Sequence, residues 1–587
     1  MRQRFLNMLA LVGFFSFVGC AAEDVLSDDP SGDDELITFS AVQEGAATKA
    51  EISQSDSKVI NWSTGDAITV YDGGGNSVRF GLTEGAGGTR ASFSGKITQT
   101  AESYLALSPY QGGTFSDDGK IEFVTMKAKQ TAVAGSFDPE TALMVSKTAP
   151  GGTSMSFRNV VGYVKVTPQF DCDMISLISE DSSDLLAGTV SIDYNNGEPV
   201  VTVSDDGTNS VSISGDIVAG KTYYIAVLPG TLKSGFRLVF FAKDGKDAVK
   251  STSKSLEIKR NTVINLGSVN STALTQIPYV TFTADAEQIF KMSLCDGITS
   301  LQYSVNNAPW QDIVSNKEIV FGGSDGSLRL RGMSALGTAI KSYASGSTEV
   351  YSSIKFGKKN VYVSCAGDIR TLVDYSNHEN AKTDRARFCY LFIRCANLLS
   401  TPDLPAMTLA DDCYYAMFSG CTGLTTAPDL PATTLAYMCY CAMFSGCIGL
   451  TTAPDLPATT LADYCYYVMF SNCKGLTTTP DLPAMTMATG CYCSMFSNCT
   501  GLTSAPDLPA MTMATWCYEE MFSGCTNLRL VRIGALKVPI KITNGNKITA
   551  FDGWLDQCAA KGIIRKPSAL TLPSSAVPSG WTVVDYD

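Results

Sequence analysis

The stretch Cys421-Thr-Gly-Leu-Thr-Thr-Ala-Pro-Asp-Leu-Pro-Ala-Thr-Thr-Leu-Ala-Tyr-Met-Cys-Tyr-Cys-Ala-Met-Phe-Ser-Gly446 is one copy of a 26-residue repeat. Cysteine recurs at this spacing in two series. The first series comprises Cys395, Cys421, Cys447, Cys473, Cys499 and Cys525. The second series comprises Cys413, Cys439, Cys465, Cys491 and Cys517. A repeat of this length is typical of proteins built from stacked units, each of which contacts only its neighbours.

Apolar side chains occupy fixed positions of the repeat. In the quoted copy they are Leu424, Leu430, Leu435, Met443 and Phe444. One unit alone has no partner against which to bury this face, whereas stacked units bury it in a continuous core. The pattern therefore predicts a solenoid in which each unit has a short strand over 424–427 and a short helix or turn over 439–445.

Three elements of the repeat closely resemble BspA-like leucine-rich repeats: Met417–Cys421, Gly423–Thr425 and Leu430–Ala432. Such repeats occur on surface proteins of Bacteroidales and other host-associated microbes. The resemblance spans residues 388–527 and implies a leucine-rich-repeat solenoid that serves adhesion or ligand binding, although family members differ in what they bind. The unit is longer than the commonest form of that family, so the geometry of one loop face is not transferred. Residues 528–587 are expected to close the stack as a C-terminal cap.

The roles of the nineteen cysteines must be weighed against one another. Disulfides are the first expectation in a secreted chain. On a helix, Cys439 and Cys447 would stand about 12 Å apart, too far for a bond within one unit, while bonds between coils remain open. A metal site at Cys439-Tyr-Cys441 is disfavoured because Tyr415 and Tyr467 replace its second cysteine in the neighbouring copies. We favour buried thiols that pack as small hydrophobic groups.

Two adjacent positions before the second cysteine series vary from copy to copy, which marks an exposed strip. Aromatic side chains there can stack on sugars or peptides, although surface drift without function is the simpler explanation. The candidate strip comprises Asp411, Asp412, Tyr437, Met438, Asp463, Tyr464, Thr515 and Trp516.

A ladder of carboxylates repeats at each Pro-Asp-Leu-Pro. Its members are Asp403, Asp429, Asp455, Asp481 and Asp507. Aligned carboxylates can bind calcium, but an aspartate before a turn usually accepts local backbone N–H groups, which is the role we expect. We predict no cofactor and no resident metal.

The charge and histidine content exclude several functions. The chain has 57 acidic and 44 basic residues, a net charge of −13, which disfavours nucleic acid as a partner. His378 is the only histidine, so catalysis based on imidazole has little support. The neighbouring pair Asp411 and Asp412 is the one hydrolase candidate, and adjacent side chains usually point apart. We therefore predict a protein that is not an enzyme.

The N-terminus resembles a bacterial lipoprotein signal. Arg2 and Arg4 precede an apolar run over 5–18 that is too short to span a membrane, and Cys20 follows a small residue. This resemblance implies a signal peptide over 1–19 and lipid on Cys20, with an ordinary signal peptide as the alternative. The acidic stretch over 20–35 is expected to be a solvated tether and resembles the surface-export signal of Bacteroides-type lipoproteins. We expect a lipid-anchored, surface-exposed protein of the outer membrane.

Residues 36–268 alternate apolar and polar side chains in short runs interrupted by turn residues, as in Ala67–Tyr71. Such alternation predicts one β-sandwich over 36–150 and a second over 151–268. A third small β-sandwich is expected over 278–376 as the N-terminal cap of the repeats. There we expect Trp310 to pack in a core rather than to await a ligand.

Four motifs in residues 36–268 together resemble fimbrillin-like proteins of Bacteroidales. They are Trp62–Asp66, Tyr104–Tyr110, Tyr223–Gly230 and Arg260–Leu266. The resemblance implies two tandem transthyretin-like sandwiches from a pilus precursor, in which a protease removes the first strand and a strand of another subunit replaces it. Lys49 is the candidate processing residue, and fimbrial subunits are candidate partners.

Two functions therefore lead. The first is a surface lipoprotein adhesin whose repeats bind a host or microbial protein or glycan, with the fimbrillin-like half as a stalk or pilus subunit. Because the chain continues for some 320 residues beyond 268, it is better suited to end a filament than to repeat in a shaft. The alternative is a monomeric outer-membrane lipoprotein that captures glycan or protein and joins no pilus.

Overall fold

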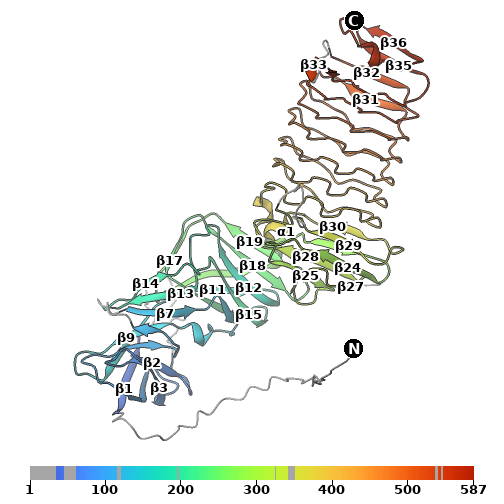
Figure 1. The fold of residues 1–587 in the computed structure, drawn as a ribbon. Coiled ribbons are helices and arrows are strands. Elements are labelled where there is room, and N and C mark those ends of the chain that lie inside the picture. The colour runs from blue at the N-terminus through green and yellow to red at the C-terminus, as the bar shows by residue number, and fades with distance from the viewer. Residues whose placement is uncertain are drawn as a thin grey trace, which may run out of the picture.

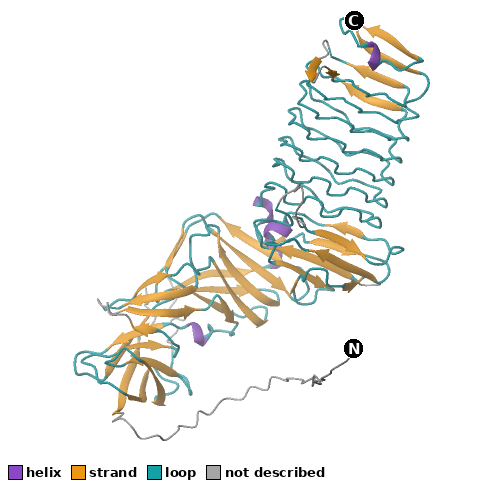
Figure 2. Ribbon diagram, in the orientation of Figure 1, coloured by secondary structure: helices purple, strands orange, loops and turns teal. Residues whose placement is uncertain are grey.

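The computed structural model describes residues 35–44, 61–115, 120–194, 197–323, 326–340, 351–535, 540–543 and 546–586. The protein is mainly β and elongated, with the N-terminal strands and the C-terminal end at opposite ends of the molecule (Figure 1). Strands dominate the N-terminal half, whereas turns and loops make up most of the repeats (Figure 2). Within the described residues, no helix is both long enough and apolar enough to cross a membrane.

The first unit is a closed barrel with the strand order β1-β10-β9-β5-β2-β3-β4. β1 closes it by pairing antiparallel with β4 and parallel with β10. Phe39, Phe80, Phe93 and Trp62 fill the interior. We predicted a β-sandwich here, which has two separate sheets. The strands form one sheet instead, and β1 closes it by pairing with both β4 and β10. The strands are β1 (Glu35–Gln43), β2 (Ala67–Tyr71), β3 (Ser77–Glu84), β4 (Arg90–Ile97), β5 (Leu105–Ser108), β9 (Met144–Lys147) and β10 (Ser154–Asn159).

The second unit contains sheets ordered β16-β11-β21, β22-β19-β18-β12-β15-β8, β14-β13-β7-β6 and β17-β20. Its strands are β6 (Thr114–Phe115), β7 (Lys120–Met126), β8 (Lys129–Thr131), β11 (Gly162–Pro168), β12 (Cys172–Ser179), β13 (Gly188–Asp193), β14 (Val200–Val203), β15 (Ser210–Ile217), β16 (Tyr223–Val227), β17 (Gly230–Leu232), β18 (Phe236–Ala242), β19 (Ala248–Thr252), β20 (Leu256–Ile258), β21 (Val263–Val269) and β22 (Thr275–Gln276).

The strands do not divide between the first two units at residue 150. β7 pairs with β13 and β8 pairs with β15, so residues 120–131 join sheets of the second unit. β10 begins at Ser154 yet belongs to the barrel. Alternation in the sequence reveals a strand but not which distant strand it pairs with, and this is why the expected boundary differs.

The third unit contains sheets ordered β26-β25-β28-β23-β30 and β27-β24-β29. It covers the first coil of the repeats, since the Ile354 N–H donates to the Leu391 carbonyl at 2.8 Å. One hydrophobic core runs unbroken from Val280 through the repeats to Trp581. The elements are β23 (Val280–Thr283), β24 (Gln288–Ser293), β25 (Leu301–Val305), β26 (Gln311–Asp312), β27 (Ile319–Phe321), β28 (Ser327–Gly332), β29 (Ser353–Phe356), β30 (Ser364–Ala366) and α1 (Thr371–Asp374).

A dense contact joins the second and third units. The guanidinium of Arg331 lies over the rings of Trp310, Tyr375 and Phe241 at 4.3, 4.5 and 4.8 Å. Arg237 donates to Glu180 at 2.6 Å and to Asp374 at 3.2 Å. Trp310 therefore packs, as expected, but it does so in the joint between two units rather than in the core of its own unit.

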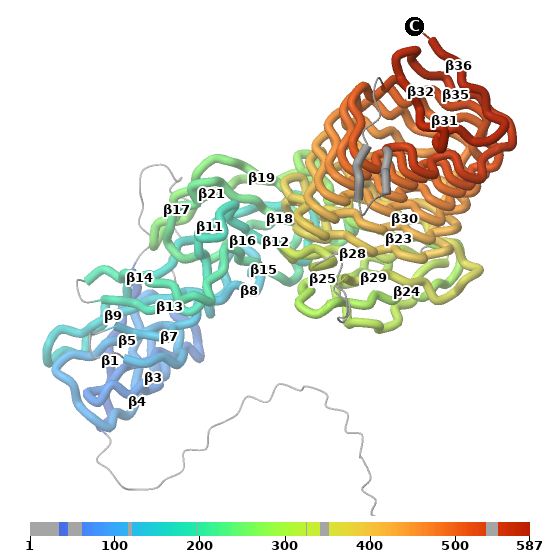
Figure 3. The backbone as a smooth tube through the Cα atoms, turned by 45° about the horizontal axis from the view of Figure 1, so that its top comes forward, coloured from blue at the N-terminus to red at the C-terminus, as the bar shows by residue number. Residues whose placement is uncertain are grey.

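The 26-residue copies stack as successive coils (Figures 1 and 3). In the turn segment of each coil, alternate N–H groups bond to the next coil, as from Tyr414 to the Cys439 carbonyl at 3.1 Å. The residues between them bond within their own coil, as from Tyr415 to the Asp412 carbonyl at 3.0 Å. The predicted turn over 439–445 is confirmed, whereas no strand forms over 424–427.

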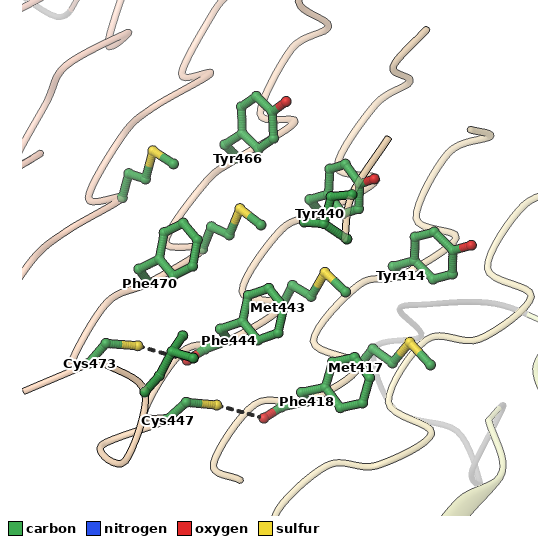
Figure 4. Packing of buried hydrophobic residues seen from close by; sticks show 14 of the residues in the cluster. Tyr414, Met417, Phe418, Tyr440, Met443, Phe444, Cys447, Tyr466, Phe470 and Cys473 are labelled. Carbon is green, nitrogen blue, oxygen red and sulfur yellow. Dashed lines mark hydrogen bonds between the residues drawn. The ribbon is translucent and has the colours of Figure 1, made fainter. Parts of the chain in front are cut away.

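Aromatic rings and thiols stack in register inside the coils (Figure 4). Phe444 and Phe470 lie 5.6 Å apart at 7°, and Tyr440 and Tyr466 lie 5.8 Å apart at 4°. The Cys447 thiol donates to the carbonyl of Phe418 in the preceding coil at 3.2 Å. The same bond recurs from Cys421, Cys473, Cys499 and Cys525.

The C-terminal residues continue the stack with a parallel sheet ordered β31-β32-β35-β36. Trp554 and Trp581 are buried, and their indole N–H groups donate to the carbonyls of Ala576 and Ala559. The strands are β31 (Ser504–Leu508), β32 (Leu530–Ile533), β33 (Ile540–Thr543), β34 (Asn546–Thr549), β35 (Gly562–Pro567) and β36 (Trp581–Tyr586). Four short 3-10 turns complete the described elements: Pro139–Thr141, Ser271–Ala273, His378–Asn380 and Ser574–Ala576.

Candidate binding strip on the repeats

The second position of the candidate strip has the same left-handed backbone in every copy. The φ angles are 58° at Asp412, 51° at Met438, 56° at Tyr464, 58° at Gly490 and 59° at Trp516. A turn conformation that repeats in successive coils places these residues in one column along the stack. The sequence comparison that grouped them is thus matched by a common backbone position.

Three tyrosines form an aromatic cluster on this surface. Tyr437 is 43% exposed, and its ring meets Tyr464 edge to face at 6.0 Å. Tyr464 in turn meets Tyr467 at 5.9 Å and 87°. A Cβ atom at Gly490 would lie 2.3 Å from the Tyr464 ring, so this ring extends across the neighbouring coil. The glycine leaves the space that the ring occupies.

Sequence reasoning missed Tyr467 as part of the surface. The signal was present in the alternation of Cys389, Tyr415, Cys441, Tyr467 and Cys493 at one repeat position. The tyrosines are half-buried and the cysteines are buried, so large and small side chains alternate along the stack.

The carboxylates of the strip have structural partners. Asp411 accepts the Tyr437 N–H at 3.1 Å, and Asp463 accepts the Thr489 N–H at 2.8 Å. Asp412 is only 3% exposed, and its carboxylate lies 3.6 Å from the Arg385 guanidinium. The adjacent acids Asp411 and Asp412 are thus held by different groups, which does not favour their use as a catalytic pair.

The far end of the strip is acidic. Thr515 and Trp516 are half-buried, and Glu519 and Glu520 follow them in the same coil. The Ser494 hydroxyl donates to Glu520 at 3.3 Å. Burial raises the pKa of Glu519, and the neighbouring carboxylates of Glu520 and Asp552 raise it further.

The Pro-Asp-Leu-Pro ladder stands apart from the strip. All five of its aspartates are exposed. Partial burial raises the pKa of the Asp403 carboxyl, and the charges of Asp368 and Asp429 add to this effect. Within the described residues, no group of three or more histidine, cysteine, aspartate or glutamate side chains has the arrangement of a metal site.

The eighteen cysteines of the described residues are thiols that form no disulfide there. Burial raises their pKa values, to about 12 for Cys473, and the reactive form of cysteine is the thiolate. The repeat cysteines are therefore packing groups with low reactivity, as the sequence favoured.

A cavity of about 820 Å³ lies between the barrel and the second unit. Its two carboxylates are engaged, since Asp66 accepts the Ser63 N–H at 2.7 Å and Glu140 pairs with Lys127. Cys20 and Lys49, the candidate lipidation and processing residues, lie outside the described residues.

Comparison with known proteins finds similar solved structures. A protein of Bacteroides uniformis provisionally described as a cell adhesion protein is 15% identical, with a TM-score of 0.27 over 42% of this chain and 96% of its own. A protein of Bacteroides ovatus with the same description is 12% identical, with a TM-score of 0.28 over 41% and 95%.

A fimbrial protein of Bacteroides ovatus is 12% identical, with a TM-score of 0.20 over 49% of this chain and 55% of its own. No protein-family model and no curated protein sequence matches the chain. At such low identities and TM-scores, we base the function on this chain's own residues.

Proposed function

We propose that this protein is a cell-surface adhesin without enzymatic activity, which binds a host or microbial protein or glycan through the candidate strip. The observation that carries the proposal is the contrast between columns of the stack. Tyr440, Phe444 and Cys447 recur unchanged and buried inside the coils, whereas Met438, Tyr464 and Trp516 differ from one another at one half-buried position of the coil. Packing fixes the first set and leaves the second open to selection by a ligand.

The shape of the molecule supports display of the repeats. The barrel and the second unit precede the stack along the chain, the barrel lies at the end of the molecule away from the stack, and the Arg331 joint fixes the stack to the second unit (Figure 1). With lipid on Cys20 as the anchor, the N-terminal units act as a stalk that holds the leucine-rich-repeat stack away from the outer membrane.

A pilus role would use the barrel. β1 lies between β4 and β10, and Lys49 follows it in the sequence. Cleavage after Lys49 would remove β1 and expose two sheet edges, which a strand of a fimbrial subunit can fill. The alternative is that β1 stays in place and the protein acts alone as a surface lipoprotein.

An adhesion assay tests the binding role. A strain that lacks the gene is complemented with the wild type or with a Tyr437→Ser, Tyr464→Ser, Trp516→Ser variant, and attachment to epithelial cells and to neighbouring bacteria is counted. We expect the variant to attach no better than the deletion strain.

The matched control replaces three exposed apolar side chains of another column, Met407, Met485 and Met511, with serine. This control should attach like the wild type. Equal loss in both variants would contradict a role for the strip. Immunogold labelling of residues 388–527 and N-terminal sequencing then separate the two anchoring modes: label at filament ends with a new terminus at Ala50 indicates a pilus, and label on the cell body with lipid on Cys20 indicates a lone lipoprotein.

A further inference from the structure

The charged side chains around the aromatic strip are acidic from Tyr437 onward. Asp463 and Glu520 are exposed, and Glu519 and Asp552 are half-buried in the coils that follow. Lys474 is the only basic residue between Cys395 and Glu519, and it occupies a different position of its coil. Arg385 lies beside Asp412 at the first coil of the strip, and from Tyr437 toward Glu520 a ligand meets these carboxylates.

The tyrosine rings stand in this negative field. Burial raises the pKa of Tyr437, and Asp412, Cys441, Asp463 and Asp411 raise it further. The same carboxylates that disfavour a phenolate favour a cation at the ring. Tyrosine faces attract cations through the ring quadrupole, and arginine binds such faces better than other side chains do.

The column has the length of a short extended peptide. Four coil steps separate Tyr437 from Asp552, which at about 4.8 Å per step is roughly 19 Å. An extended chain rises about 3.3 Å per residue, so roughly six residues span this distance. Edge-to-face packing of Tyr437, Tyr464 and Tyr467 fixes the rings before a ligand arrives, which reduces the ordering cost of binding.

We propose that the strip, together with Tyr467, Glu519 and Glu520, binds an extended basic segment of a partner protein, with arginine or lysine side chains against the tyrosine rings and the carboxylates. The proposal rests on the adhesive role of the strip and specifies its ligand. Charge complementarity favours this occupant over a neutral glycan, which gains nothing from the absence of bases, and over any anionic polymer, which the carboxylates repel.

Fluorescence anisotropy with labelled peptides tests the inference on the full chain. The probes are a peptide of about eight residues that alternates glycine and arginine, the same peptide with glutamine or glutamate in place of arginine, and a neutral hexasaccharide. We expect only the arginine peptide to bind, and we expect its affinity to fall steeply as salt rises from about 0.05 to about 0.5 M.

Two charge variants give the test its specificity. The strip charge variant carries Asp463→Asn, Glu519→Gln and Glu520→Gln. It should bind the arginine peptide with about tenfold lower affinity. The asparagine keeps an oxygen for the Thr489 N–H. The control variant changes the net charge equally but on the Pro-Asp-Leu-Pro ladder, through Asp429→Asn, Asp455→Asn and Asp481→Asn. It should change the affinity for the arginine peptide less than about twofold.

A ring variant tests the tyrosines separately. Tyr464→Leu should lower the affinity for the arginine peptide about threefold. The matched control Tyr362→Leu, at a tyrosine that is 56% exposed in the third unit, should have no effect.

Three results would overturn the inference. Equal loss in both charge variants would show attraction to net charge alone. Binding of the hexasaccharide with loss in Tyr464→Leu would show a glycan site, and the adhesive role would then stand. Absence of binding by every probe would show that the strip does not bind a basic segment. The attachment assay of the strip variant decides the adhesive role independently.

Discussion

The repeats and the barrel bury similar kinds of side chains, but they organise them by different rules. In the repeats, Phe444 packs on Phe470 because both occupy the same position 26 residues apart. In the barrel, Trp62 meets Phe93 and Phe157, at 4.9 and 5.6 Å, from distant and unrelated parts of the sequence. The core positions of the stack therefore recur in the sequence every 26 residues. The core of the barrel depends instead on strand pairings that no local pattern reveals.

Alkaline pH should separate the two regions most strongly, and the stack should unfold first. The folded pKa of Cys473 is about 12, against about 8.5 in an unfolded chain. Because the folded pKa is the higher one, the unfolded state loses its thiol proton first. The free energy of unfolding is therefore unaffected below about pH 8.5 and falls as pH rises toward 12, by about 1.4 kcal/mol per thiol and pH unit. The barrel has no cysteine, since none lies between Cys20 and Cys172.

Limited proteolysis with peptide mapping across pH 7 to 11 checks this order. Cleavage within the coils should begin at lower pH than cleavage within the barrel. Cys473→Ala should reduce the slope of stability against pH by about one proton. Simultaneous cleavage of both regions would show that the thiols do not control alkaline stability.

Truncation of one ring in each region should have the next largest effect. Phe470→Ala removes a ring that contacts Phe444 and Phe496, and it should cost the stack about 3–5 kcal/mol. Phe93→Ala should cost the barrel a similar amount. Hydrogen exchange resolved by peptide should show each loss in its own region. Weakening of the barrel by Phe470→Ala would mean that the two cores unfold as one.

The joint between the second and third units should have a smaller, coupling effect. Arg331→Ala removes a buried cation from three rings and should cost about 2 kcal/mol. Calorimetry should then resolve two transitions that lie closer together in the wild type. The exposed Arg565→Ala is the control, and it should leave the transitions unchanged.

The sequence predicted the stacked repeats, the thiols and the turn over 439–445 because each is repeated at a fixed position. It did not predict that β1 closes a barrel or that β7 pairs with β13, since such register depends on long-range contacts. At the strip, variation identified Tyr437 and Tyr464, whereas Tyr467 was hidden in an alternation with cysteine. Neither the joint role of Trp310 nor the capping role of Asp463 has a local sequence signal.

The capping role of Asp463 gives the smallest expected effect and distinguishes structure from binding at the strip. Its carboxylate accepts the Thr489 N–H of the next coil at 2.8 Å on an exposed surface. Asp463→Ala should cost about 1 kcal/mol in urea unfolding, and Asp463→Asn should restore most of it because the amide oxygen accepts the same hydrogen. Asp455→Ala, at an exposed carboxylate of the ladder, should cost less. If Asp463→Asn instead unfolds as readily as Asp463→Ala, then the charge rather than the hydrogen bond stabilises the coil, and the carboxylate cannot be neutralised without changing the fold that presents the tyrosines.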